Sequence, residues 1–301
     1  IIVDQLGVMT TGIRPGDYFD DILLFLNTML NVEAVKVYPG IMMRRPAFKA
    51  AKARVEELGQ KVLDFHRQNP PETSGRAPDL IDDVLANKRP DGDPFTEDDL
   101  IAMAIGPYFA GMDTVASSIS FLIYNILKYP DVLAKIQVEV DAAFAKGSIT
   151  HKDFQQMPVL HAAVLETLRL FPATPFTPRT VIQEFEFGGY TFKVGTEVMI
   201  AQTLTHFLPE YYPDPMKFDV NRHLEKSGPR VAQTFAPYTL GAHTCLGAGL
   251  AEMQMMVTMS ALLHYARLEL ETPGYEARIH TMPLPNPGQN FKIRVKEVHN
   301  S

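Results

Sequence analysis

Residues 238–247 read YTLGAHTCLG and contain the single cysteine of this 301-residue chain. Gly241 and Gly247 frame Cys245 and let the backbone turn tightly and approach a flat partner closely. Residues 248–263 are rich in Met, Leu and Ala and predict a helix that begins just after the cysteine. Its positive end, with amides directed at the sulfur, would stabilise a metal-binding thiolate. The alternative is a buried, inert cysteine.

Three further motifs accompany this loop. Residues 110–114 read AGMDT inside an apolar segment, residues 166–169 read ETLR, and residues 215–222 read PMKFDVNR. In type and order, the four motifs resemble those of the cytochrome P-450 haem-thiolate monooxygenases, whose haem loop has the pattern Phe-x-x-Gly-x-x-x-Cys-x-Gly. Tyr238 stands where the family usually has Phe, and Val220 replaces the second proline of its Pro-x-x-Phe-x-Pro-x-Arg motif. The resemblance covers essentially the whole chain.

The resemblance implies a mainly helical fold with minor β-structure, in which a long central helix precedes the haem loop. We expect residues 1–301 to form a single, partial haem-thiolate catalytic domain. Segments 17–30 and 46–67 fit the helix pair that precedes the central helix, so the family's N-terminal third is expected to be absent. The chain is then either a fragment or a sequence given without its upstream residues, and the absence of Trp is consistent with this.

Several local expectations come from the residue pattern itself. The apolar stretch 101–127 is long enough to span a membrane, but Asp113 near its middle favours a buried central helix. A further helix is expected from Pro130 to Lys146. Segments 185–190 and 191–200 predict a small hairpin that turns at Gly188-Gly189, and the clearest late strand is 291–298.

The resemblance also implies the cofactor contacts. Cys245 would be the axial ligand of haem b, iron protoporphyrin IX, because a thiolate pushes electron density onto the iron and favours O–O cleavage. His243 and Arg179 would face haem propionates, although each has the alternative of being a solvated surface residue. By the same resemblance, five further residues are expected to contact the cofactor: Tyr238, Gly241, Gly247, Ala110 and Gly111.

Glu166 and Arg169 lie one helical turn apart, and Arg222 belongs to a separate, proline-rich segment. By resemblance, the three form a buried network that supports the haem loop without taking part in the chemistry. Loss of one member of a buried pair costs roughly 3–5 kcal/mol. The alternative is a pair of exposed helix charges that contribute about 0.5 kcal/mol or less.

Asp113 and Thr114 are the catalytic candidates. An acid and a hydroxyl in an apolar helix are costly unless they are paired or used. The Thr114 hydroxyl could bond back to the Ala110 carbonyl and open a groove. By resemblance, Thr114 steadies bound oxygen and Asp113 relays protons, whereas the alternative is a packing site. By the same resemblance, the substrate is expected to contact Ile105, Phe109, Phe176 and Leu284. Their apolar character predicts a lipophilic substrate.

The resemblance thus implies a monooxygenase that uses O2 and electrons from a separate ferredoxin or flavoprotein reductase. Alternatives are a haem-thiolate isomerase, peroxygenase or dehydratase, which often lack an Asp-Thr pair, and a haem-free helical fragment that acts as a binding protein. The net charge of −7, with no basic stretch interleaved with aromatics, argues against a nucleic-acid partner. A lone cysteine fits a reducing compartment, so we expect the cytoplasm or the cytoplasmic face of a membrane. A membrane anchor upstream stays open.

Overall fold

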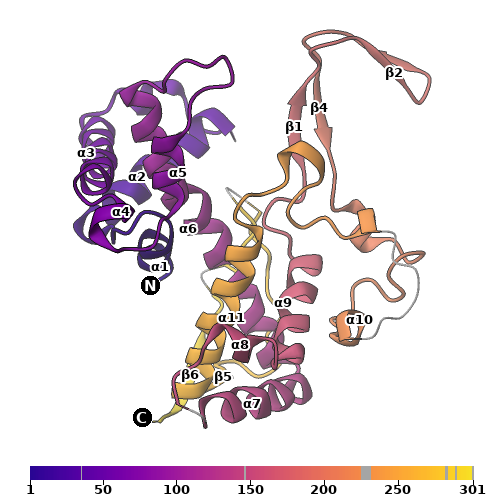
Figure 1. The fold of residues 1–301 in the computed structure, drawn as a ribbon. Coiled ribbons are helices and arrows are strands. Elements are labelled where there is room, and N and C mark those ends of the chain that lie inside the picture. Colours follow the sequence, from indigo (N-terminus) through magenta and orange to yellow (C-terminus); the bar gives the residue numbers. More distant parts are fainter. Residues whose placement is uncertain (35, 146, 225–231, 282–283, 289, 300–301) are drawn as a thin grey trace. The chain divides into compact units, whose positions relative to one another are not determined.

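The computed structural model describes the chain except residues 35, 146, 225–231, 282–283, 289 and 300–301. It divides into two compact units, residues 1–116 and 117–301. Helices dominate both, and small antiparallel sheets occur in the second unit (Figure 1). The predicted fold class is therefore confirmed. Helix α6 (Glu97–Lys128) runs from the first unit into the second, while the expectation of a single domain stays a prediction.

The first unit packs its helices around one apolar core. These helices are α1 (Ile2–Thr10), α2 (Phe19–Met29), α3 (Pro46–Gln68), α4 (Pro71–Ser74), α5 (Leu80–Ala86) and the start of α6. Along α3, Val55, Leu58 and Val62 recur at three- and four-residue intervals and are buried, which explains why this segment is a helix with one apolar face. Phe25 and Phe48 join α2 to α3, with ring centroids 5.3 Å apart. The two helices predicted at 17–30 and 46–67 agree with α2 and α3.

Helix α6 continues through a proline. Pro107 has no N–H to donate to the carbonyl one turn earlier, so it removes one bond from the helical ladder. The next residue, Tyr108, is fully buried. Its hydroxyl donates to the Ile13 carbonyl at 2.8 Å and lies 2.6 Å from the Thr11 hydroxyl, which ties α6 to the end of α1.

By length and composition, α6 could also cross a membrane, and among the described residues it is the one helix with this property. A core helix of a soluble protein has the same length and composition, so this observation alone does not distinguish the two. Asp113 lies inside α6 and is costly in a bilayer, by roughly 2.5–3.5 kcal/mol at the centre of a membrane helix. The expectation of a buried central helix remains a prediction.

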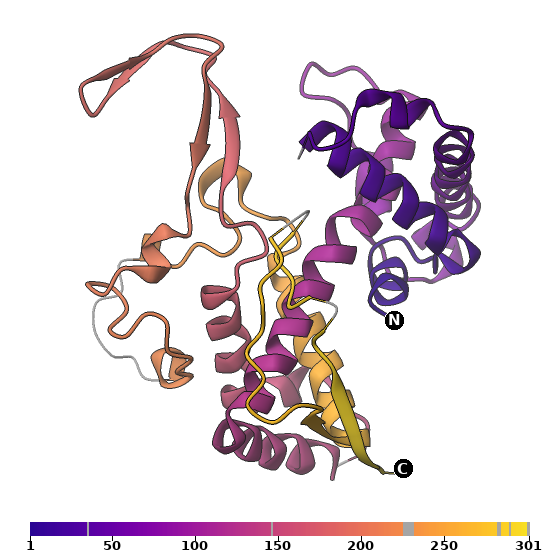
Figure 2. The ribbon, with the colours of Figure 1, turned by 180° about the vertical axis from the view of Figure 1, so that it is seen from behind.

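The second unit contains the rest of α6 with α7 (Pro130–Phe144), α8 (His151–Phe154), α9 (Pro158–Leu170), α10 (Asn221–Leu224) and α11 (Ala248–Tyr265). Both ribbon views show this part of α6 beside α9 and α11, with α7 across their lower ends (Figures 1 and 2). Phe121 of α6 stacks on Phe171 after α9, with ring centroids 4.3 Å apart. Asn125 of α6 donates to the Thr167 hydroxyl at 3.1 Å. Apolar and polar contacts together therefore fix α9 against α6.

The start of α9 is held by an acidic side chain from α7. The Glu139 carboxylate accepts hydrogen bonds from the amides of Val159 at 2.9 Å and Leu160 at 3.0 Å. Pro158, the first helical residue, has no N–H to satisfy, so Glu139 covers the next two amides. Burial raises the pKa of Glu139 and outweighs these two hydrogen bonds. This cap fixes the beginning of the helix that carries Glu166 and Arg169.

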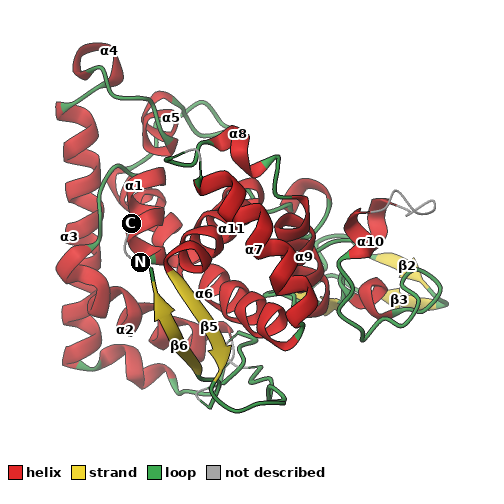
Figure 3. Ribbon diagram, turned by 90° about the horizontal axis from the view of Figure 1, so that it is seen from below, coloured by secondary structure: helices red, strands yellow, loops and turns green. Residues whose placement is uncertain are grey.

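Three strand pairs complete the second unit. Strand β1 (Thr177–Thr180) pairs with β4 (Glu197–Ile200), β2 (Phe185–Phe187) with β3 (Tyr190–Phe192), and β5 (Ala266–Leu270) with β6 (Ile293–Val298), all antiparallel. The predicted hairpin turns at Gly188-Gly189, where both residues have positive φ. Its extent was wrong, because the chain turns again at Gly195 (φ +87°) and β4 pairs with β1. Figure 2 shows β2 and β3 continuing beyond β1 and β4, and Figure 3 shows β5 beside β6.

Candidate functional site

The cysteine loop closes on itself through backbone and side-chain hydrogen bonds. The amide of Cys245 donates to the Tyr238 carbonyl at 2.9 Å. The hydroxyls of Thr239 and Thr244 donate to the carbonyls of His243 at 2.6 Å and Gly241 at 2.8 Å. Gly241 has φ +76°, a left-handed conformation that costs a residue with a side chain roughly 1–2 kcal/mol. Sequence and geometry therefore agree that this loop is a tight, internally bonded turn.

Cys245 is a free and exposed thiol. Helix α11 begins at Ala248, so the positive end of its dipole lies beside the sulfur. A Cβ added at Gly247 would lie 3.8 Å from Sγ, which shows how closely the backbone follows the thiol. The alternative of a buried, inert cysteine is wrong, because the side chain is accessible. An accessible thiol at a helix N-terminus is suited to binding a metal as a thiolate.

Two cationic candidates lie in the same unit as the thiol. Arg179 is on β1, opposite Val198 of β4, and its guanidinium donates to the Pro178 carbonyl at 2.8 Å. His243 lies inside the loop and is exposed, whereas Arg179 is half-buried. Within the described part of the chain, neither forms an ion pair with a carboxylate. Both are therefore available for an external anion, and their role toward propionates stays a prediction.

Tyr238 differs from the other loop residues because its side chain reaches into the protein. Its hydroxyl is buried and makes no hydrogen bond of normal geometry to the described residues. Burial raises the pKa of Tyr238 above its ordinary value, and the nearby Glu252 carboxylate and Cys245 thiol add to the effect. A buried hydroxyl without a partner costs about 1–3 kcal/mol. The Phe that the family usually has at this position would bring no such hydroxyl.

Elsewhere in the second unit, Glu166 is the centre of a buried network. Its two carboxylate oxygens accept hydrogen bonds from Arg169 Nε and Nη2, each at 2.9 Å, and both side chains are inaccessible to solvent. Arg222 Nε donates to the same carboxylate at 3.2 Å. Burial disfavours the charged carboxylate, but the hydrogen bonds from Arg169 and His223 outweigh it and lower the pKa of Glu166. The structure thus brings together the three residues of the predicted network.

The same network contains two histidines that the sequence did not indicate. His223 Nε2 lies 3.0 Å from Glu166 Oε2. His206 Nε2 accepts from the Ala236 amide at 2.9 Å, so its proton is on Nδ1, which donates to the Arg169 carbonyl at 3.0 Å. Burial lowers the pKa of His206 to about 4, so the ring is neutral near pH 7. The sequence gave little indication of this role, because isolated histidines in an irregular segment have no regular spacing from which their partners could be predicted.

The Thr114 hydroxyl, in the first unit, donates to the Ala110 carbonyl at 2.7 Å, as the sequence predicted. Asp113 is half-buried, and burial raises the pKa of its carboxyl group. A Cβ on Gly111 would lie 2.5 Å from Leu6 Cδ1, so a side chain there would meet α1. Close packing of α6 on α1 therefore accounts for Gly111 without a cofactor, while the cofactor role of Ala110 and Gly111 stays a prediction.

The predicted substrate residues occur in both units. Ile105 and Phe109 are partly buried against the core of the first unit, where Phe109 stacks on Phe25 with ring centroids 5.4 Å apart. In the second unit, Phe176 is 51% exposed and Leu284 is half-buried. The neighbouring residues 282–283 lie outside the described residues. Phe176 is thus the most accessible of these apolar candidates.

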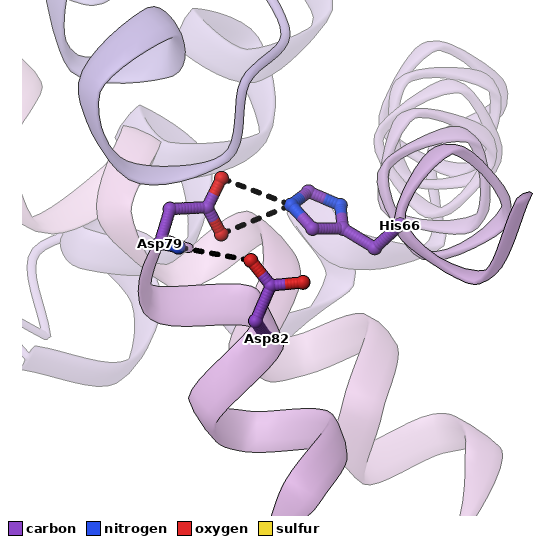
Figure 4. Close-up of side chains that lie close together, drawn as sticks. All are labelled: His66, Asp79 and Asp82. Atoms are coloured by element: carbon purple, nitrogen blue, oxygen red, sulfur yellow. Dashed lines mark hydrogen bonds and ion pairs between the residues drawn. The ribbon is translucent and has the colours of Figure 1, made fainter. Parts of the chain in front are cut away.

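One other group of potential metal ligands occurs among the described residues, in the first unit: His66 of α3 with Asp79 and Asp82 at the start of α5 (Figure 4). His66 Nδ1 lies 2.7 Å from the Val62 carbonyl, and Nε2 lies 2.9 and 3.0 Å from the Asp79 carboxylate oxygens. Both ring nitrogens of His66 therefore face oxygen atoms within this cluster. Arg76 pairs with both carboxylates and supplies the positive charge. This cluster joins α3 to α5.

Comparison with known proteins agrees with this arrangement. The family model described as Cytochrome P-450 matches residues 17–293. A sterol 14alpha-demethylase of Mycolicibacterium vanbaalenii is 32% identical over 74% of this chain and 50% of its own length. An abscisic acid 8'-hydroxylase 2 of Arabidopsis thaliana is 30% identical over 83% of this chain and 52% of its own. The chain thus spans about half the length of these curated relatives.

Solved structures show the same fold. The heme domain of cytochrome P450DA superposes with a TM-score of 0.83 at 20% identity, covering 99% of this chain and 66% of that one. A retinoic-acid-bound cyanobacterial CYP120A1 gives a TM-score of 0.79 at 23% identity, with 98% and 66% covered. The fold and the cysteine loop define a haem-thiolate protein. This chain belongs to the cytochrome P-450 family.

The family implies a haem, and the residues of the second unit fit one. Cys245 offers an accessible thiol in a loop whose backbone follows the sulfur closely. The exposed His243 and the half-buried Arg179 offer N–H donors that suit the two carboxylates of a protoporphyrin. Leu240 and Leu246 add exposed apolar surface to the same loop, at 49% and 101%. An open thiol, apolar surface and cations are the features that a flat, apolar and doubly anionic group requires.

Proposed function

We propose that this chain is the catalytic part of a haem-thiolate monooxygenase that hydroxylates or epoxidises a lipophilic small molecule. The overall reaction combines RH, O2, two electrons and two protons to give ROH and water. The exposed Cys245 thiol, held in a bonded loop at the start of α11, is the observation that carries the proposal. The homology to hydroxylases and demethylases supports it.

The bound haem would supply the oxygen-activating chemistry, and the protein residues would supply its ligand and protons. Cys245 Sγ would bind the iron, and His243 and Arg179 would hold the propionates. We propose haem b because the one cysteine of this chain is the ligand, which leaves no thiol here for a covalent thioether link. The Glu166 network would keep the loop rigid without contacting the reacting atoms.

Asp113 and Thr114 would serve proton delivery. Burial raises the pKa of the half-buried Asp113 carboxyl, which is the direction of shift that suits a relay acid. The Thr114 hydroxyl, which donates to the Ala110 carbonyl, would take part in this proton delivery. Their presence favours oxygen activation over the isomerase, peroxygenase and dehydratase alternatives.

We further propose a lipophilic substrate that contacts Ile105, Phe109, Phe176 and Leu284, and a separate ferredoxin or flavoprotein reductase as the electron source. Two relatives act on sterols by name, a sterol 14alpha-demethylase and a mitochondrial sterol 26-hydroxylase of Oryctolagus cuniculus, and this supports a substrate of sterol-like character. For location, we propose the cytoplasm or the cytoplasmic face of a membrane.

The decisive experiment is the ferrous–CO spectrum of the haem-loaded protein. We expect the red-shifted Soret band of a thiolate ligand, lost in Cys245→Ser. Thr244→Ser is the matched control, because it keeps the hydroxyl bond to the Gly241 carbonyl and should keep the band. A protein that binds no haem, or a Cys245→Ser variant with an unchanged band, would overturn the proposal and favour the haem-free binding protein or another ligand.

A further inference from the structure

Residues 34–55 carry only positive charge. They contain no acidic residue and six basic ones, which are Lys36, Arg44, Arg45, Lys49, Lys52 and Arg54. The whole chain has a net charge of −7, so this stretch is opposite in sign to the protein that contains it. It links α2 to α3 and includes the N-terminal part of α3, all within the first unit. A local concentration of positive charge of this kind attracts an anionic partner.

Within the described part of the chain, three of these cations have no carboxylate partner. Lys52 and Arg54 form ion pairs with acidic residues of α2 and α3 at 3.0–3.4 Å. Arg44, Arg45 and Lys49 form none, and all three are exposed. Lys49 follows Arg45 by one helical turn and lies on the side of α3 away from its buried apolar residues. These three residues, the cation group, are therefore open to an external anion.

Three exposed apolar side chains, the apolar group, come directly before the cation group. Val37 is 59% exposed, Tyr38 47% and Ile41 66%. Hydrogen bonds hold the backbone that carries them. The amides of Val37 and Tyr38 both donate to the Asn31 carbonyl, at 2.9 and 3.0 Å, and Gly40–Arg44 forms a 3-10 turn. The apolar group is thus held in water, next to positive charge.

We propose that residues 37–49 are a docking surface for an anionic lipid bilayer. The apolar group enters the membrane interface, where apolar side chains leave water and a tyrosine ring is favoured. The cation group lies at the level of the lipid phosphates and is attracted to them. Through this surface the protein lies on the membrane without crossing it.

The combination of the two groups favours lipid over other anionic partners. A nucleic acid would neutralise the cation group with its phosphates but would gain little from the exposed aliphatic side chains. A stable protein interface buries about 800 Å² on each partner, which is more than this short turn offers. A bilayer requires no matching shape, and apolar insertion and attraction to anionic lipids add to each other. The docking surface extends the proposed location at a membrane face, and a lipophilic substrate collects in the bilayer.

The test is the partition of the full chain onto unilamellar vesicles, measured by co-sedimentation. We expect the wild type to bind vesicles that contain phosphatidylserine far better than vesicles of phosphatidylcholine alone. Arg44→Gln/Arg45→Gln should weaken binding to the phosphatidylserine vesicles by roughly ten-fold or more, because each cation near such a surface contributes about five-fold. Val37→Ser/Ile41→Ser should weaken binding even at high salt, which screens the charges but not the apolar contribution.

The matched control is Arg14→Gln/Lys88→Gln, which removes the same charge elsewhere in the first unit. Both residues are exposed. They follow segments that contact Phe65 and His66 near the C-terminal end of α3, whereas the docking surface lies at its N-terminal end. Binding should be nearly unchanged in this control. Circular dichroism checks that all variants keep the wild-type helix content.

Equal losses in the two charge variants, or a wild type that does not bind phosphatidylserine vesicles, would overturn the docking surface. Tighter binding to a DNA duplex or to polyglutamate than to the vesicles would also overturn it, because the cations would then serve another class of partner. None of these measurements needs haem. A missing thiolate Soret band would contradict the proposed function alone, so the two failures are distinguishable.

Discussion

Arg169 and Glu166 face each other through two hydrogen bonds of 2.9 Å, with neither side chain accessible to solvent. Arg169 extends beyond this pair, because its Nη1 donates to the His206 carbonyl at 2.7 Å. A single guanidinium therefore satisfies a carboxylate on its own helix and a backbone carbonyl far along the chain. Its planar, rigid fork makes this possible, and a lysine could not do the same.

We expect Arg169→Ala to cost roughly 3–5 kcal/mol in the free energy of unfolding, because it leaves the Glu166 charge buried without its main partner. Urea unfolding followed by circular dichroism measures this. Arg294→Ala is the control, since Arg294 is exposed and lies 3.7 Å from Glu269, and it should cost less than about 1 kcal/mol. Similar stability of the two variants would contradict the buried network.

Acid should destabilise the protein through His206 before it acts on Glu166. The pKa of His206 is about 4 in the folded state against 6.5 ordinarily, so the unfolded chain binds the proton more readily. Stability is fully present above about pH 6.5 and should fall by up to about 3 kcal/mol as the pH drops to about 4. The lowered pKa of Glu166 extends the loss to lower pH.

Unfolding free energies measured between pH 7 and pH 4 should show this slope, and His206→Asn should flatten it while lowering stability at pH 7. Asn cannot take up a proton in this range. A wild-type protein with the same stability at both ends of the range would exclude a neutral, buried His206.

For catalysis, Thr114→Ala should keep the haem spectrum but lower the product formed per NAD(P)H oxidised, with more electrons leaving as hydrogen peroxide. Asp113→Asn should slow turnover by roughly 10²-fold or more, because a relay acid is lost while the pocket shape survives. The measurement needs a saturating redox partner and a known substrate. Unchanged coupling in Thr114→Ala would make the pair a packing feature of α6.

The two loop glycines should respond differently to alanine. Gly241 has φ +76°, so Gly241→Ala should destabilise the loop by about 1–2 kcal/mol and weaken haem retention. Gly247 has φ −87°, and its added Cβ would meet Sγ at an ordinary 3.8 Å, so Gly247→Ala should be tolerated better. Haem dissociation rates of the two variants measure this difference. Equal rates would show that the left-handed conformation at Gly241 does not determine how well the loop retains haem.

Helices α2 and α3 could be predicted from the sequence because their apolar residues recur at helical spacing, and α11 because its run of Met, Leu and Ala is long and has no proline. The cysteine loop and its glycines could be predicted in the same way. Residues one helical turn apart, such as Glu166 and Arg169 or Ala110 and Thr114, could also be paired from spacing alone.

The partners that distant segments contribute to these pairs and strands could be identified only from the folded structure. His206 and His223 meet the Glu166–Arg169 pair through bonds across long stretches of chain, and β4 turns away from its neighbour β3 to pair with β1. The burial of the Tyr238 hydroxyl also could not be predicted from the local sequence. The physical reason is that local sequence sets backbone conformation within a few turns, whereas the partners of buried polar groups depend on which distant segments fold together.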